Sequence, residues 1–69
     1  MNNSPDAIGR RLLEARRAKG LTQVQVQKIL GIHPNTLSEL ERGDFAAPTL
    51  KKIEKLAGLY KLGTDLVRM

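Results

Sequence analysis

The chain has 69 residues, no cysteine and a formal net charge of +5 at pH 7, from twelve Lys and Arg against seven Asp and Glu. A chain of this length forms one small domain, and without cysteine it has neither disulfide bridges nor thiolate zinc sites, so packing must hold it together. No apolar run approaches the roughly 20 residues of a membrane-spanning helix and no signal-peptide pattern is present, which predicts a soluble, cytoplasmic protein.

The first predicted element is a helix from Asp6 to Lys19, which residues 1–5 precede as a flexible tail. Apolar side chains recur along it at the spacing of one helical face. That face carries Ile8, Leu12 and Ala15. Gly20 follows a basic last turn and is typical of a helix end in the left-handed conformation. The remaining chain, residues 6–69, is expected to form a single domain.

The next segment can be interpreted in two ways. Residues 23–27 alternate polar side chains with valine, as a strand would. Thr22 and Gln25, however, have the spacing of a capping box, and Val26 and Leu30 fall on one helical face. A good cap outweighs the few tenths of a kcal/mol that each valine costs in a helix, so we predict a helix ending at Leu30.

A corner is predicted between this helix and a second short one over residues 34–41. Gly31 suits a position with positive φ, and Pro34 supplies the fixed φ of a first helical residue. His33 precedes Pro34 and is expected to cap the second helix. A lone histidine without cysteine or a second histidine is a poor metal site, so no metal is expected. Gly43 is expected to follow the end of this helix.

A fourth helix is predicted to open at Pro48 and Thr49, with its end weakened by Gly58 and Gly63. Its inward-facing residues are expected to be Leu50, Ile53, Leu56 or Ala57, and Tyr60. The chain thus predicts helices and no convincing strand. Two short helices joined by a glycine-containing turn match the helix-turn-helix motif, whose second helix is sized for the major groove of DNA.

Four runs at fixed spacing resemble the lambda-repressor-like, or XRE-type, helix-turn-helix DNA-binding domains. They are Arg-x-x-x-Gly-Leu-Thr-Gln from Arg16, Gly-Ile at Gly31, Leu-Ser-x-Leu-Glu-Arg-Gly from Leu37, and Pro-Thr-Leu-x-x-Ile from Pro48. The resemblance covers Ile8 to about Leu62 and implies an all-α, compact bundle of four to five short helices, with motif helices at about residues 22–30 and 34–41. The chain departs from the family pattern at Gln27, Gly58 and Tyr60.

The resemblance also implies which residues contact DNA. The implied base-contacting residues are Pro34, Asn35, Ser38 and Glu39. The implied backbone-contacting residues are Gln23, Thr36, Arg42 and Gly43, with Arg10, Lys51 and Lys52 as weaker candidates. Asn35 can pair with adenine and Glu39 can accept from cytosine, although either can also be an ordinary exposed helix residue. Gln23 can likewise be only a solvated residue at a helix start.

An ion pair and a dimer interface complete the implied site. Glu41 lies at the C-terminal end of its helix, where an acid needs a cationic partner. The resemblance implies Arg16 as that partner, in a partly buried pair. Apolar residues at the C-terminus are the candidate interface of a homodimer: Leu59, Leu62, Leu66, Val67 and Met69. The alternative is that Leu62 and Leu66 only close the core of the monomer.

We therefore expect a sequence-specific regulator, a homodimeric repressor that binds a double-stranded DNA operator. No nucleophile triad, phosphate loop or cofactor fingerprint is visible, so no enzyme activity, cofactor, membrane partner or small-molecule effector domain is expected. The alternative is a helical protein-interaction module. It is favoured by the charge distribution, because residues 1–20 and 48–69 each carry a net +3, whereas residues 21–47 carry −1.

Overall fold

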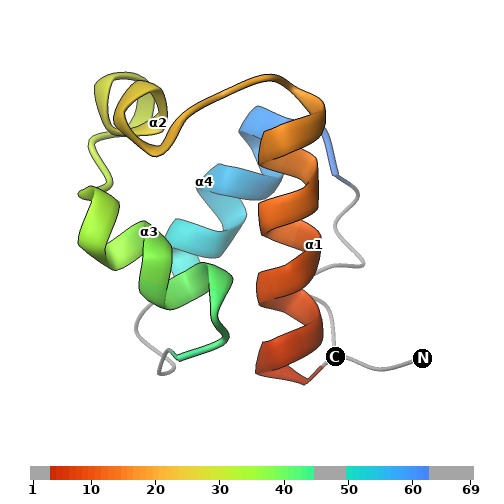
Figure 1. The fold of residues 1–69 in the computed structure, drawn as a ribbon. Helices are drawn as coiled ribbons and strands as arrows, with labels where there is room; N and C mark the ends of the chain where they lie inside the picture. The colour runs from red at the N-terminus through yellow and green to blue at the C-terminus, as the bar shows by residue number, and fades with distance from the viewer. Residues whose placement is uncertain (1–3, 45–49, 63–69) are drawn as a thin grey trace.

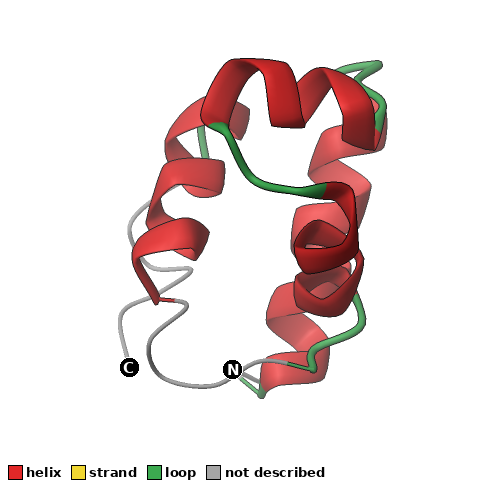
Figure 2. Cartoon of the chain, turned by 90° about the vertical axis from the view of Figure 1, so that its left-hand side faces the viewer, coloured by secondary structure: helices red, strands yellow, loops and turns green. Residues whose placement is uncertain are grey.

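A computed structural model of the chain describes residues 4–44 and 50–62. Within them lie four α-helices and no strand, as Figure 2 shows. The helices are α1 (Pro5–Ala18), α2 (Gln23–Leu30), α3 (Pro34–Glu41) and α4 (Leu50–Tyr60). The predicted all-α bundle is confirmed. None of the helices in the described part is long and apolar enough to cross a membrane.

The long helix α1 forms one side of the molecule, and α2 and α3 form the other (Figure 1). Helix α3 packs against both α1 and α2, while α1 also packs against α4, which lies behind the motif helices in this view. Because α3 contacts two other helices, a helix of only two turns is held in a fixed position by its neighbours.

The core receives side chains from all four helices and from the corner between α2 and α3. Its buried members are Ile8, Leu12, Val26, Ile32, Leu37, Leu40, Ile53, Leu56, Ala57 and Tyr60. Burial of aliphatic side chains of this size contributes about 1.5 to 3 kcal/mol each. Leu56 and Ala57 are both buried, but the prediction for Leu50 is wrong, because its side chain is 46% exposed. Gln27 is exposed on α2 and does not enter the core.

Helix α1 begins one residue earlier than predicted. Ser4 is its N-cap, with a side chain that accepts a hydrogen bond from the Ala7 amide at 3.3 Å, and Pro5 occupies the first turn. Pro5 was wrongly assigned to the tail, because its fixed φ and missing N–H suit the first helical position. The last helical residue is Ala18, with Lys19 as the C-cap. Residues 1–3 lie outside the described residues, so the division into a tail and a domain stays a prediction.

The segment that alternates polar residues and valine is a helix. The capping box is formed, since the Gln25 amide donates to the Thr22 hydroxyl at 3.1 Å and the Gln25 side chain accepts from the Thr22 amide at 2.8 Å. Gly31 ends α2 with φ of 77°, a left-handed conformation that costs glycine little. His33 caps α3, as predicted, because its Nδ1 accepts from the Asn35 amide at 3.0 Å.

Helix α4 continues through Gly58, which does not interrupt it, and ends at Tyr60. The next residue, Lys61, has φ of 60° and donates its amide to the Gly58 carbonyl, while the Leu62 amide donates to Ala57 at 2.8 Å. These two bonds are the pattern of a Schellman cap. A lysine therefore occupies the left-handed position that glycine usually takes at such an end.

Two glycines, Gly9 within α1 and Gly43 just after the end of α3, allow α1 and α3 to approach closely. A Cβ atom at Gly9 would lie 2.5 Å from the carbonyl oxygen of Leu40 and 2.7 Å from that of Glu41. A Cβ atom at Gly43 would lie 2.8 Å from the amide of Asp6. The sequence did not indicate a role for Gly9. In the structure, its lack of a side chain allows the short distance between α1 and the end of α3.

Candidate nucleic-acid interface

The outer face of α3 carries a stripe of polar side chains at helical spacing. The stripe consists of Asn35, Ser38 and Glu39 of α3 and of Arg42, the C-cap residue that directly follows the helix. Ser38 is half-buried, whereas the other three are exposed. Leu37 and Leu40 lie on the opposite face and are almost completely buried. The apolar face therefore anchors α3 in the core and leaves the polar face toward solvent.

The start of α3 is held by its cap. Pro34 has no amide hydrogen, the Asn35 amide donates to His33, and the Leu37 amide donates to the His33 carbonyl at 2.9 Å. Backbone groups at this end are thus largely satisfied within the protein. The side chains of Asn35 and of half-buried Thr36 remain for contacts with a partner.

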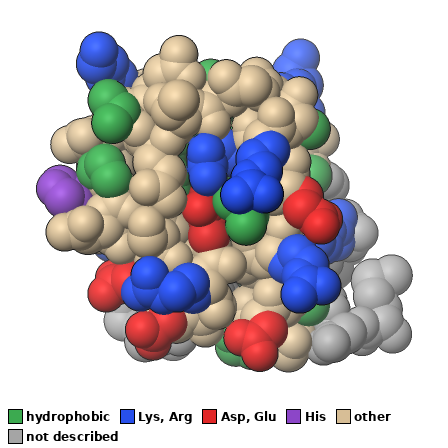
Figure 3. Space-filling model, in the orientation of Figure 1, with side chains coloured by type: hydrophobic (Ala, Val, Ile, Leu, Met, Phe, Trp, Pro, Cys, Tyr) green, Lys and Arg blue, Asp and Glu red, His purple; other side chains and the backbone are tan. Residues whose placement is uncertain are grey.

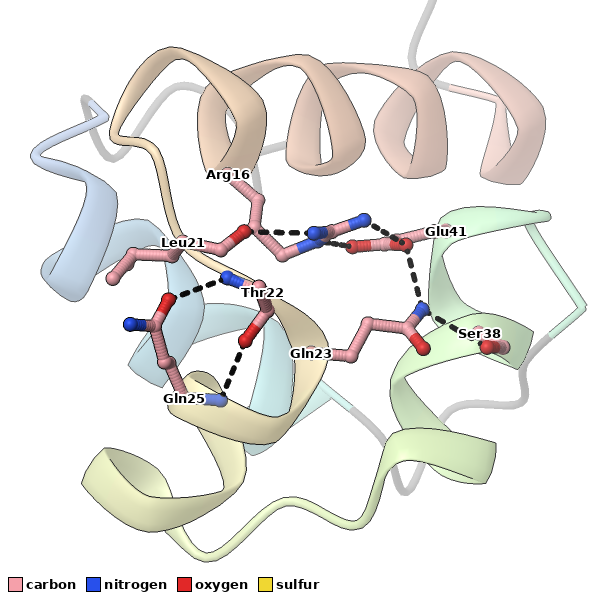
Figure 4. A network of polar contacts seen from close by, with 7 residues as sticks. All are labelled: Arg16, Leu21, Thr22, Gln23, Gln25, Ser38 and Glu41. Carbon is pink, nitrogen blue, oxygen red and sulfur yellow. Dashed lines mark hydrogen bonds and ion pairs between the residues drawn. The ribbon is translucent and has the colours of Figure 1, made fainter.

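Arg16 and Glu41 form an ion pair between α1 and the end of α3 (Figure 4). The Arg16 Nε atom donates to one carboxylate oxygen at 2.7 Å and a terminal nitrogen donates to the other at 3.3 Å. The side chains are only 12% and 6% exposed. The remaining terminal nitrogen of Arg16 donates to the Leu21 carbonyl at 2.8 Å. One guanidinium therefore ties α1 to α3 and to the loop before α2.

Gln23 extends this network to the polar stripe. Its Nε2 atom donates to the Ser38 hydroxyl at 2.9 Å and to a Glu41 carboxylate oxygen at 3.2 Å, as Figure 4 shows. Sequence reasoning assigned Gln23 to a phosphate and overlooked this internal role. The contact of Gln23 with DNA stays a prediction, and in the free protein its amide nitrogen already has two acceptors.

The predicted backbone-contacting residues are spread over all four helices and the two residues that follow α3. Arg42 is exposed directly after α3, but the Gly43 amide donates to the Leu40 carbonyl at 3.0 Å and so would have to share its hydrogen with a phosphate. Arg10 is exposed on α1, and Lys51 and Lys52 are exposed in the first turn of α4. Arg10 also lies in the lining of a depression of about 430 Å³. Asp6 and Glu14 share that lining, so the depression is of mixed charge.

Side chains of both charges are interspersed on the face drawn in Figure 3. Lys and Arg groups alternate there with Asp and Glu, and most of the remaining surface is uncharged, so no continuous basic patch covers it. Attraction of this face to a polyanion therefore depends on individual basic side chains and not on a continuous basic surface.

The candidate dimer interface is described only in part. Leu59 and Leu62 are partly buried and pack against the core. Leu66, Val67 and Met69 lie outside the described residues. Elsewhere in the described part, Val24 and Ile29 of α2 are large apolar side chains with more than half of their surface exposed, at 53% and 54%. The sequence pattern did not single out these two.

Tyr60 lies in the core with its hydroxyl buried and without a hydrogen-bond partner among the described residues. The pKa of Tyr60 is raised to about 12, chiefly by burial and secondly by the Glu41 carboxylate, while Arg16 acts to lower it. The tyrosine thus places a polar atom in the electrostatic field of the ion pair. Within residues 4–44 and 50–62, no three His, Asp or Glu side chains gather in a way that could hold a metal ion.

Comparisons with known proteins show a family model and a relative to which the chain is similar. A family model described as helix-turn-helix matches residues 12–67. The chain is also 41% identical over 59 residues to the HTH-type transcriptional regulator ImmR of Bacillus subtilis (strain 168). The match covers 86% of this chain and 46% of that relative, so the chain spans about half the length of the relative. No solved structure matches the chain.

Proposed function

Because the chain belongs to the helix-turn-helix family of lambda-repressor-like domains, we propose that it binds a double-stranded DNA operator sequence-specifically and regulates transcription. Helix α3 enters the major groove and α2 crosses the backbone beside it. A dimer that occupies an operator blocks other proteins from that DNA, which makes repression the direct mode of action. A DNA-binding regulator acts where the DNA is, so we infer a cytoplasmic location.

The observation that carries the proposal is the two-sided character of α3. Its leucines are buried and its outer face is a polar stripe of groups that can donate or accept hydrogen bonds. Base edges in the major groove are distinguished by their pattern of donors and acceptors, so exposed polar side chains on an anchored helix are the features that can read them. Asn35 suits adenine, and Glu39 suits the amino group of cytosine.

A mobility-shift titration against genomic fragments at two salt concentrations tests the proposal. Specific retention with a steep dependence on salt is expected, because phosphate contacts release counterions. Sequencing the retained fragments then identifies the operator. If no fragment is retained even at low salt, the proposal that the protein binds DNA is wrong, and the second candidate function is favoured.

The second candidate is a helical protein-interaction module. It is supported by the net −1 of residues 21–47 and by the mixed charge of the face in Figure 3, since most DNA-binding surfaces are more basic. Glu39 also places an acid on the outer face of α3, where phosphates would repel it. The titration separates the two candidates, because a protein-interaction module gives no salt-dependent, sequence-specific complex with DNA.

Substitutions divide the roles within the proposed interface. Asn35→Ala is expected to weaken binding to the selected operator by about 1 to 3 kcal/mol, to affect random DNA far less, and to flatten the preference at one or two base pairs. Arg42→Ala and Lys51→Ala are the contrasting variants. Each should weaken binding to both DNAs similarly and reduce the salt slope by about one unit.

Glu39→Gln gives the sharper readout within the stripe. Removing an acid should strengthen non-specific binding and change the preferred base. If Asn35→Ala and Glu39→Gln both leave the selected sequence unchanged, the stripe does not read DNA.

A further inference from the structure

The side chain of His33 uses one of its two ring nitrogens within the protein. Its Nδ1 atom accepts a hydrogen bond from the Asn35 amide at 3.0 Å, which caps α3. A neutral imidazole has one nitrogen that carries the proton and one that accepts. Because Nδ1 has a single lone pair in the plane of the ring, it cannot accept this bond and also carry a proton. The cap therefore assigns the proton of neutral His33 to Nε2.

The Nε2–H group of His33 is available to a partner. His33 is exposed, and the bond to Nδ1 is the one hydrogen bond between its ring and the described residues. The two nitrogens lie on different edges of the ring, so Nε2 points away from the first turn of α3 when Nδ1 faces it. A protonated ring nitrogen has no lone pair with which to accept. His33 thus presents a donor and no acceptor directly before the first residues of α3.

The geometry points to His33 as a further specificity-determining residue, which donates from Nε2 to an acceptor atom on a base edge. The inference rests on the proposed function, because it needs the N-terminal end of α3 in the major groove, where the first residues of a recognition helix contact bases. Guanine presents two acceptors in that groove, N7 and O6, whereas cytosine presents an amino donor. A ring that can only donate therefore prefers guanine and disfavours cytosine at the position it faces.

The helix cap sets the size of this preference. To accept from the amino group of cytosine, the ring would have to move its proton to Nδ1 and give up the bond to the Asn35 amide. Loss of an N-cap typically changes an equilibrium constant by about fivefold. We therefore expect the wild type to bind a site with cytosine at this position about fivefold or more weakly than the same site with guanine.

Three substitutions separate the donor from the cap. His33→Asn keeps the cap, because the side-chain oxygen of asparagine accepts well at an N-cap, but it has no group at the position of Nε2. His33→Ala removes both the cap and the donor. Thr22→Asn is the matched control, since it replaces the N-cap residue of α2 in the same way.

Each protein is used to select duplexes from a randomised library at about pH 8, where histidine side chains are neutral. The urea midpoint of each variant confirms that it is folded. His33→Asn should lose the rejection of cytosine at one base pair and leave the urea midpoint, the salt slope and the rest of the selected site unchanged. This base pair should differ from those that Asn35→Ala affects. His33→Ala should lose the same preference and also be less stable, and Thr22→Asn should select the wild-type site.

Other outcomes overturn the inference in distinguishable ways. If His33→Asn selects the wild-type site, His33 serves only as a cap. If it weakens all duplexes equally and lowers the salt slope, Nε2 contacts a phosphate and not a base. If it alters only the base pair that Asn35→Ala alters, His33 acts through Asn35. If the wild type retains no DNA, the proposed function itself falls, and the base contact falls with it.

A measurement without DNA tests the position of the proton by itself. Long-range ¹H–¹⁵N spectra distinguish a protonated ring nitrogen from an accepting one, and the chain has one histidine, so its signals in the untagged protein are unambiguous. At about pH 8, Nε2 should show the ¹⁵N shift of a protonated nitrogen and Nδ1 that of an acceptor. Averaged shifts would show that the proton exchanges between the two nitrogens, and the inference would be wrong whatever the protein binds.

Discussion

Glu41 accepts hydrogen bonds from α1 and α2 while it belongs to α3, so its removal leaves several donors unpaired. Arg16, whose side chain is only 12% exposed in the intact protein, would lose its counter-charge, and Gln23 would lose one of its two acceptors. Because the charge left behind is largely desolvated, we expect Glu41→Ala to lower the free energy of unfolding by about 2 to 4 kcal/mol. Urea unfolding measures this loss.

Glu39→Ala is the control for that prediction. Glu39 is an exposed acid of the same helix without an ion pair in the described part of the chain, and its removal should change stability by less than about 0.5 kcal/mol. Equal effects of the two substitutions would mean that the Arg16–Glu41 pair contributes nothing beyond a surface charge.

For Tyr60 we predict that removal of a polar group does not lower the stability of the protein, in contrast to Glu41. Its buried hydroxyl has no partner among the described residues, and burying an unpaired hydroxyl costs about 1 to 3 kcal/mol. Tyr60→Phe should therefore leave stability unchanged or raise it by about 1 kcal/mol. A loss of 2 kcal/mol or more in thermal or urea unfolding would show that the hydroxyl is bonded in solution, for example through a water molecule.

The same tyrosine predicts a loss of stability at high pH. Its pKa is raised from 10.0 to about 12 in the folded protein, chiefly by burial and secondly by Glu41. Between these pH values the folded state keeps a proton that the unfolded state has released, so stability falls as the pH rises. Wild type should lose about 1 to 2 kcal/mol more than Tyr60→Phe between pH 10 and pH 12. Parallel pH profiles of the two proteins would contradict the assigned cause.

At the scale of the helices, two glycines in helical positions predict opposite outcomes. A methyl group at Gly9 would lie 2.5 Å from a backbone oxygen of α3, and backbone cannot move aside as a flexible side chain can. A methyl group at Gly58 would meet no atom within 4 Å. Gly9→Ala should therefore destabilise the protein by about 2 to 3 kcal/mol. Gly58→Ala should stabilise it by about 0.5 to 1 kcal/mol, because alanine favours the helix.

Thermal unfolding compares the stabilities of the two variants, in each of which a glycine is replaced by alanine. A similar shift of the melting temperature in both would indicate that helix propensity alone matters and that α1 and α3 do not approach closely at Gly9. The Gly9 variant should also bind the selected operator more weakly, since its strain lies against the end of α3 that carries Glu41.

At the scale of the whole molecule, we expect a homodimer on DNA, because one small domain makes a limited contact and paired half-sites increase affinity. Sedimentation at tens of micromolar concentration, with and without operator, measures the assembly. Val67→Asp should dissociate the dimer if the C-terminal apolar residues form the interface. Val24→Asp is the control on α2, where an exposed valine offers a competing surface. A monomer in all conditions would remove the dimer, and dissociation by Val24→Asp alone would move the interface to α2.

The sequence by itself determined the features that depend on neighbours in the chain. The capping box of Thr22 and Gln25, the left-handed Gly31 and the cap at His33 are each decided within a few residues, so local physical chemistry predicted α2, the corner and α3 correctly. The pairing of Arg16 with Glu41 was predicted only in part from neighbours in the chain. The helix dipole indicated that Glu41 needs a cation, and the family resemblance identified which one.

Only the tertiary structure decided features that depend on which helices meet and how closely. The spacing of apolar residues placed Leu50 on the inner face of α4 together with Ile53. Ile53, Leu56 and Ala57 are buried, whereas Leu50, the first residue of the helix, is 46% exposed, because the packing of α4 does not cover its first turn. The close approach at Gly9 depends on an oxygen of α3 that is more than 30 residues away in the chain.

The direction of the Gln23 amide is likewise set by two groups of another helix, Ser38 and Glu41. Local patterns carry no information about such contacts, because hydrogen-bond direction and backbone clearance arise only when separate elements are brought together.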